Sequence, residues 1–195
     1  MIRSLSALAF FAFTALGAQA VTLDPHGQIR PELLGQALAA QESHKADLRD
    51  TGRLVIVDYS RHSREARLYV VNLQTGDVAA FRAAHGKGSD ADHDGYLDSF
   101  SNEPGSSASP QGAFATAEEY VGKHGRSLRL DGLDATNSAS RERAIVVHAA
   151  DYAEPEFLAQ HGKLGRSNGC IVFSKADLTT FLAEVPEGTL LFVGK

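Results

Sequence analysis

The only cysteine of the chain follows a short stretch rich in glycine and polar residues. Residues 165–170 read Gly-Arg-Ser-Asn-Gly-Cys, and an apolar segment follows Cys170 directly. Glycines allow a tight turn and a close approach of the backbone to a ligand. Such a turn can present a thiol beside backbone N–H groups, and acyl transfer needs a thiolate together with oxyanion donors. The stretch predicts a nucleophilic Cys170, against the alternative of a small buried hydrophobic residue.

A histidine upstream could activate this thiol. A free thiol has a pKa of about 8.5 and is only a few per cent ionised at neutral pH, so it needs a base or a cation nearby. His148, at the end of an apolar run, is the candidate base, and Arg166 is the candidate cation. A hydrogen-bonded structural histidine is the alternative for His148. For six other histidines we expect surface or loop positions: His26, His44, His62, His85, His124 and His161.

A second polar motif has the pattern D-x-D-x-D-G. It places four carboxylates where the loop of an EF-hand has oxygen ligands: Asp90, Asp92, Asp94 and Asp98. The twelfth position is Ser101, where an EF-hand has a bidentate Glu. We therefore expect neither an EF-hand nor a resident cofactor. A looser calcium site at these aspartates is the alternative to a solvated acidic loop.

Composition excludes several classes of protein. The chain has 195 residues, 43% hydrophobic and 22% charged, which is typical of a globular domain. With 19 Lys and Arg against 24 Asp and Glu, its net charge of -5 argues against a nucleic-acid binder. A single cysteine excludes an internal disulfide, a Cys-based zinc knuckle and an iron–sulfur cluster. No histidine spacing matches H-E-x-x-H, so a metallohydrolase ranks last.

The first twenty residues resemble a targeting segment. Arg3 precedes an apolar run that ends in Ala18-Gln19-Ala20, which predicts a secretory signal peptide over residues 1–20. The run is shorter than the ~20 residues of a membrane-spanning helix. We therefore expect an exported protein of the periplasm or cell envelope, without a membrane span after cleavage. An unpaired cysteine in such a protein favours a reactive thiol or an intermolecular bridge.

The elements that must position Cys170 and His148 are mostly short strands. Apolar, β-branched runs between turn residues predict strands at 54–57, 67–73, 78–84, 113–116, 127–130, 144–148, 170–173 and 190–193. Helical spacing predicts one helix over 31–50, and a capping box at Ser174 and Asp177 predicts a second near the C-terminus. The glycine- and serine-rich residues 86–112 predict a long functional loop.

These elements indicate a mainly β protein, built as a barrel or sandwich with one helix near each end. We expect an N-terminal helical flank over residues 21–52 and a catalytic domain over 53–195. No internal repeat or second domain is visible in the sequence.

Several ordered blocks resemble the YkuD-like L,D-transpeptidase family, in the branch of murein L,D-transpeptidase catalytic domains. His148 followed by Ser167-Asn168-Gly169-Cys170 is similar to the family signature, a His and then Ser-x-Gly-Cys. The wider similarity covers residues 100–106, 122–127, 132–134 with Asn137, 143–148 and 165–167. It extends over most of the chain from about residue 57.

The resemblance implies a β-rich cysteine acyltransferase acting on stem tetrapeptides of peptidoglycan. Cys170 would attack the carbonyl of an L-to-D peptide bond, with His148 as general base and then general acid. A thioester would form, and a diaminopimelate amine or water would resolve it. The carbonyl of Ala149 would orient the imidazole, and the N–H groups of Gly169 and Cys170 are the candidate oxyanion donors.

The sequence departs from the commoner form of the signature at two places. Asn168 stands where many members have a second His, and no Arg closely follows Cys170. Arg166 is what the narrower branch shows instead, and we favour a bidentate contact with a substrate carboxylate over a loop-stabilising role. Ser167 and Asn168 are the other candidate substrate-binding residues.

Other functions remain open at this point. An L,D-carboxypeptidase or another cell-wall peptide hydrolase could use the same fold, and a non-catalytic wall-binding protein would keep the thiol silent. We expect peptidoglycan stem peptides as the partner, no nucleic acid, and a monomer.

Overall fold

The computed structural model describes residues 21–195, so the expected signal peptide lies outside the described residues. The helices are α1 (Pro31–Ser43), α2 (Pro155–His161) and α3 (Lys175–Glu184), with short 3₁₀ turns at Lys45–Asp47, Lys87–Ser89 and Asp151–Ala153. The strands are β1 (Asp50–Asp58), β2 (Leu68–Asn72), β3 (Val78–Phe81), β4 (Gly112–Gly122), β5 (Gly125–Gly132), β6 (Val146–Ala149), β7 (Ile171–Phe173) and β8 (Thr189–Gly194). None of the described helices has the length and apolar character that crossing a membrane requires.

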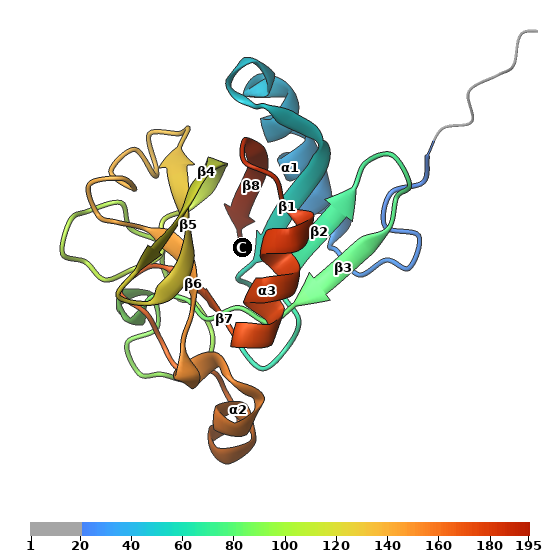
Figure 1. Cartoon of the computed structure of the whole chain (residues 1–195). Helices are drawn as coiled ribbons and strands as arrows, with labels where there is room; N and C mark the ends of the chain where they lie inside the picture. The colour runs from blue at the N-terminus through green and yellow to red at the C-terminus, as the bar shows by residue number, and fades with distance from the viewer. Residues whose placement is uncertain (1–20) are drawn as a thin grey trace, which may run out of the picture.

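The eight strands form one sheet in the order β3-β2-β1-β8-β4-β5-β6-β7. The pairs β1–β8 and β6–β7 are parallel, and the others are antiparallel. The chain after β3 reaches the opposite edge of the sheet, where Ala84 donates to Val172 O (2.8 Å) and accepts from Val172 N–H (3.3 Å). This bridge nearly closes the curved sheet into a barrel (Figure 1). The predicted β-rich, barrel-like fold with a helix near each end is confirmed.

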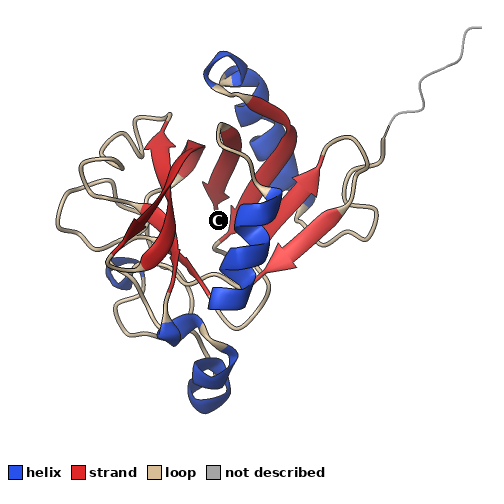
Figure 2. Cartoon of the chain, viewed as in Figure 1, coloured by secondary structure: helices blue, strands red, loops and turns tan. Residues whose placement is uncertain are grey.

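Strand β1 explains why the core has two layers. Side chains alternate across a strand, so a continuous apolar run is buried on both faces. Val55 and Val57 belong to the core that α3 covers, whereas Leu54 and Ile56 pack with Leu33 of α1. The two helices accordingly lie on opposite sides of the sheet (Figure 2).

Several element boundaries differ from the prediction. Helix α1 begins at Pro31 as expected but ends at Ser43, because the chain must turn back to add β1 to the sheet from Asp50 onward. Helix α2 was not predicted, because its seven residues bury no side chain and carry no apolar periodicity. The cap of α3 is confirmed, since Ser174 Oγ accepts the N–H of Asp177 at 3.1 Å. The division at residue 52 stays a prediction.

The hairpin of β4 and β5 is longer than predicted. Its far end pairs residues 119–122 with residues 125–128 through the backbone, and all residues from 121 to 126 are exposed. Exposed pairs leave no apolar pattern, so the sequence signal stops where the hairpin leaves the core. The extension ends in the turn residues Lys123 and His124.

Residues 86–111 form an irregular loop, with one 3₁₀ turn, that is anchored against the turn before Cys170. Gly86 bridges Ser167, and a Cβ on Gly86 would lie only 2.8 Å from the Cα of Gly169. The two segments can approach this closely because both positions lack side chains. The loop therefore packs directly against the turn that ends at Cys170.

Candidate active site

Cys170 is the last residue before β7 and ends a tight turn. Ser167 Oγ accepts the N–H of Gly169 (3.0 Å) and donates to the carbonyl of Cys170 (2.8 Å). Gly169 has φ +117°, and a Cβ there would lie 2.7 Å from the carbonyl oxygen of Ala108. Only glycine fits this conformation and this space. The turn leaves Cys170 partly exposed, with its thiol donating to the carbonyl of Ala144 at 3.7 Å.

His148 lies on β6, the strand beside β7. The parallel register pairs His148 with Val172, which places the imidazole near the start of the strand that follows Cys170. His148 Nδ1 lies 3.0 Å from the carbonyl of its neighbour Ala149. Because a carbonyl only accepts, Nδ1 carries the proton in this bond and the neutral ring keeps a lone pair on Nε2. This is the orienting contact that the family resemblance implies.

The pKa values of the two groups favour a neutral pair. Burial raises the pKa of the Cys170 thiol, although the Val146 N–H, Lys123 and Arg143 oppose this effect. Burial also lowers the pKa of His148, in spite of its bond to Ala149. Desolvation disfavours the charged form of each group, so burial favours a neutral thiol and an unprotonated imidazole. The imidazole is thus ready to accept a proton.

Both residues line one pocket of about 390 Å³. The remaining lining residues are Tyr120, Lys123, His124, Arg143, Ala144, Val146, Tyr152, Arg166, Ser167 and Asn168. No carboxylate is among them, whereas three cationic side chains are. The pocket therefore favours an anionic ligand.

The predicted substrate-binding residues divide into three cases. Arg166 lines the pocket, but its guanidinium donates to the backbone carbonyl of Asp90, as in the loop-stabilising alternative. The hydroxyl of Ser167 is fully used inside the turn, while Asn168 is exposed at the pocket. The N–H of Gly169, an expected oxyanion donor, is also engaged, because the tight turn directs it at Ser167 Oγ.

Sequence reasoning missed other residues of the pocket. The ring of His124 stacks on that of His148, with centroids 4.3 Å apart and an interplanar angle of 22°. Arg143 holds the carbonyl of Ser101 at 2.6 Å and interacts electrostatically with Cys170. Lys123, His124 and Arg143 lie inside the blocks of family resemblance, which was the only available signal.

The six other histidines lie in loops or at the surface, as expected, but two of those in loops are buried. His85 is 1% exposed and His62 is 8% exposed. His85 is buried because Arg67 and Asp90 bind its two ring nitrogens. His62 is buried beside the loop at Gly95, and its Nε2 lies 3.0 Å from the carbonyl of Asp94.

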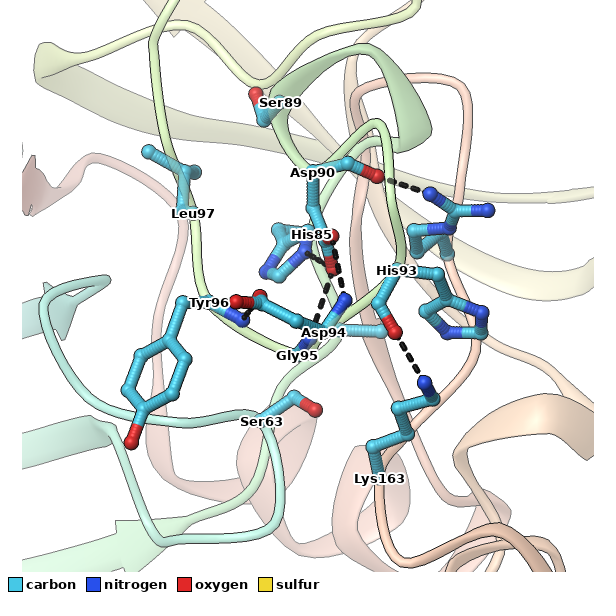
Figure 3. Close-up of polar contacts among 12 residues, drawn as sticks. Ser63, His85, Ser89, Asp90, His93, Asp94, Gly95, Tyr96, Leu97 and Lys163 are labelled. Atoms are coloured by element: carbon cyan, nitrogen blue, oxygen red, sulfur yellow. Dashed lines mark hydrogen bonds and ion pairs between the residues drawn. The ribbon is translucent and has the colours of Figure 1, made fainter.

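The acidic motif is folded into a compact loop. Asp90, Asp92 and Asp98 each bring one carboxylate oxygen within 4.8 Å of the others, and they are the group in residues 21–195 that could hold a metal ion. Asp94 is not part of the group, since its carboxylate accepts the N–H of Tyr96 at 2.8 Å. Asp90 is fully buried, so the loop is not simply a solvated acidic surface. Figure 3 shows Asp90 pointing toward His85.

Comparison with known proteins gives one family. The family model of the L,D-transpeptidase catalytic domain matches residues 25–193. An L,D-transpeptidase from Mycobacterium smegmatis is 16% identical, with a TM-score of 0.46 over 74% of this chain and 59% of that one. L,D-transpeptidase 3 from Mycobacterium tuberculosis is 15% identical, with a TM-score of 0.46 over 74% of this chain and 61% of that one. The chain thus spans less than two thirds of these structures. No curated protein matches the sequence.

Proposed function

Because the chain belongs to the family of L,D-transpeptidase catalytic domains, we propose that it is an exported cysteine acyltransferase acting on stem tetrapeptides of peptidoglycan in the cell envelope. One observation carries the proposal: Cys170 and His148 line the same pocket, and the bond from Nδ1 to Ala149 leaves Nε2 free to accept a proton. A nucleophile and a base whose orientation is fixed by a third group are the arrangement of covalent acyl transfer.

The first half of the reaction forms a thioester. The proton of the Cys170 thiol moves to His148 Nε2 while Sγ attacks the carbonyl carbon of the L-to-D peptide bond. The tetrahedral intermediate then collapses, the C–N bond breaks, and His148 returns its proton to the amine of the departing D-amino acid. The acyl group of the donor stem stays on Sγ.

The second half regenerates the enzyme. An amine of a second stem attacks the thioester carbon and gives a proton to His148, which protonates the sulfur as it leaves. Water in place of the amine gives hydrolysis by the same steps. The fold therefore serves both a transpeptidase and an L,D-carboxypeptidase, and the acceptor decides which product appears.

Two features of the pocket support this chemistry. The Cys170 N–H is the remaining candidate oxyanion donor, because the N–H of Gly169 is engaged by Ser167. Lys123, Arg143 and Arg166 bring positive charge to a pocket whose proposed substrate carries carboxylates. The loop-stabilising bond of Arg166 leaves Lys123, on the exposed hairpin turn, as a more accessible cation for a substrate carboxylate.

The experiment is muropeptide analysis with the parent protein and the Cys170→Ala variant. Purified protein is incubated with tetrapeptide muropeptides, with and without an amine acceptor, and the products are identified by mass spectrometry. We expect cross-linked product from the parent when the acceptor is present, and neither cross-linking nor trimming from Cys170→Ala. Trimming alone would assign a carboxypeptidase. Processing by Cys170→Ala at the parent rate would refute the proposal, as would slow iodoacetamide labelling of Cys170 with no product from the parent.

A further inference from the structure

Three buried polar side chains outside the pocket form a continuous hydrogen-bonded chain. Arg67, His85 and Asp90 are each at most 1% exposed, and none of them lines the pocket. Arg67 Nη2 lies 2.8 Å from His85 Nδ1, and His85 Nε2 lies 3.0 Å from Asp90 Oδ2. The acyl-transfer steps do not use any of these groups.

The two partners of His85 determine which of its ring nitrogens carries the proton. A guanidinium only donates, so His85 Nδ1 must accept from Arg67. The neutral ring then carries its proton on Nε2 and donates it to the carboxylate of Asp90. A neutral imidazole thus links a buried cation to a buried anion.

Both charged ends are satisfied by further contacts. Arg67 also donates to the carbonyls of Ala83 (2.8 Å) and Arg61 (2.9 Å). The carboxylate of Asp90 accepts the N–H groups of Asp94 (3.0 Å) and Gly95 (3.2 Å), as Figure 3 shows around His85 and Asp90. Buried ionised groups are tolerated when they are paired and hydrogen-bonded in this way, and removing one partner is costly. The hydrogen bonds among Arg67, His85 and Asp90 therefore hold the backbone at residues 85–90 in one conformation.

The same segment binds the turn that ends at Cys170. The carbonyl of His85 accepts the N–H of Ser167 at 2.8 Å, and the N–H of Lys87 donates to the carbonyl of Ser167 at 2.8 Å. Arg166 adds a bond from its guanidinium to the carbonyl of Asp90. Both peptide groups of Ser167, three residues before the nucleophile, are thereby fixed by residues 85–87.

A serine hydroxyl completes the connection. Ser109 Oγ accepts the N–H of Gly86 at 2.9 Å and lies 3.3 Å from the carbonyl of Gly169, to which it donates. The turn before Cys170 is therefore held by the backbone of residues 85–87 and by the hydroxyl of Ser109, which itself binds Gly86.

We propose that Arg67, His85 and Asp90 are positioning residues that set the geometry of the Cys170 turn for acyl transfer. The proposal rests on the proposed function, and it assigns these residues no contact with the substrate. They act through Ser167 and Arg166. Loss of the hydrogen bonds among these three side chains leaves the thiol in place but allows its turn to shift relative to His148.

The test compares two replacements of the central residue. In His85→Gln, the side-chain oxygen can accept from Arg67 and the amide can donate to Asp90, so both bonds are retained. In His85→Phe, a ring of similar shape makes neither bond. We measure kcat and KM on tetrapeptide muropeptides, and the rate at which iodoacetamide labels Cys170 in the folded protein.

We expect His85→Gln to stay within about threefold of the parent in kcat and in labelling rate. For His85→Phe we expect kcat to fall about 10- to 100-fold with little change in KM, since a small misplacement of a reacting group costs rates of this size. Its labelling rate should change with kcat. Asp90→Asn keeps the side-chain volume but replaces one acceptor oxygen by a donor, so it should behave like His85→Phe. It takes the place of His85→Phe in the test if His85→Phe does not fold.

The matched control destabilises the protein elsewhere. Thr116 is 2% exposed, its hydroxyl donates to the carbonyl of Pro186 at 2.8 Å, and it lies outside the pocket. Thr116→Val should lower the melting temperature while leaving kcat and labelling unchanged. The positioning role is wrong if His85→Phe and Asp90→Asn match this control in kcat and labelling rate. It is also wrong if His85→Gln loses as much kcat and labelling rate as His85→Phe. A parent protein that processes no muropeptide contradicts the proposed function, while the labelling comparison still decides the positioning role.

Discussion

The imidazole of His124, on the turn between β4 and β5, stacks on the imidazole of His148, with ring centroids 4.3 Å apart. The outer ring covers a face of the proposed base and interacts with it electrostatically. After burial itself, His124 is among the groups that lower the pKa of His148, together with Lys123. The hairpin turn thus influences the protonation of His148.

Replacing His124 should move the acidic limb of the pH profile. Without this ring, His148 gains water and loses the electrostatic effect of His124, and both changes raise the pKa of His148. Because the reaction needs unprotonated His148, the acidic limb of kcat/KM should shift to higher pH in His124→Ala. His124→Phe retains a stacked ring without the electrostatic effect of the imidazole, so the shift of its acidic limb should be smaller. An acidic limb that moves to lower pH would contradict this assignment.

Removing the charge of Lys123 should slow labelling of the thiol. Lys123 and Arg143 favour the thiolate of Cys170 against the larger effect of burial. Lys123→Met should therefore raise the pKa of Cys170 and slow iodoacetamide labelling at neutral pH by about two- to fivefold, the size expected for a solvent-screened charge. The difference should shrink in high salt. Lys45→Met, at an exposed lysine outside the pocket, is the control and should leave the rate unchanged.

Two glycines with positive φ angles should respond differently to alanine. Gly105 has φ +82°, and a Cβ added there would meet no atom within 4 Å, so Gly105→Ala should cost roughly 1–2 kcal/mol for the left-handed conformation alone. At Gly169 the added Cβ would lie 2.7 Å from the carbonyl oxygen of Ala108, so Gly169→Ala should cost about 3 kcal/mol or more. Urea unfolding measures both, and equal costs would show that the turn is not tightly packed.

The buried histidine should make stability depend on pH. Burial, with a further contribution from Arg67, lowers the pKa of His85 from 6.5 to about 4. Between these values the unfolded chain binds a proton that the folded protein excludes, so stability falls as the pH drops through this window. The contribution is up to about 3 kcal/mol. Urea unfolding at pH 7 and pH 4.5 should show a smaller difference for His85→Gln than for the parent; an equal difference would assign the loss to other groups.

Local signals in the sequence predicted the parts of the protein that depend on neighbouring residues. The turn before Cys170, the start of α1 at Pro31 and the cap at Ser174 each need only a few adjacent residues. The apolar run before His148 and the family resemblance both pointed to this residue, and the structure places it in one pocket with Cys170.

The features that the sequence did not predict depend on contacts between residues far apart in the chain. The burial of His85 depends on Arg67, eighteen positions earlier, and no periodic pattern marks such a pair. The place of His124 depends on the full length of an exposed hairpin whose side chains carry no apolar alternation. Barrel closure depends on Ala84 meeting Val172, which neither segment encodes locally.

The bridge between Ala84 and Val172 also bears on when the thiol becomes competent during folding. It joins segments distant in sequence, and such contacts form late because loop closure costs entropy. The bridge lies two residues after Cys170 and one residue before His85. While this bridge is open, the segment after Cys170 is not joined to the segment before His85. The turn that carries the proposed nucleophile therefore reaches its final position only when the barrel closes.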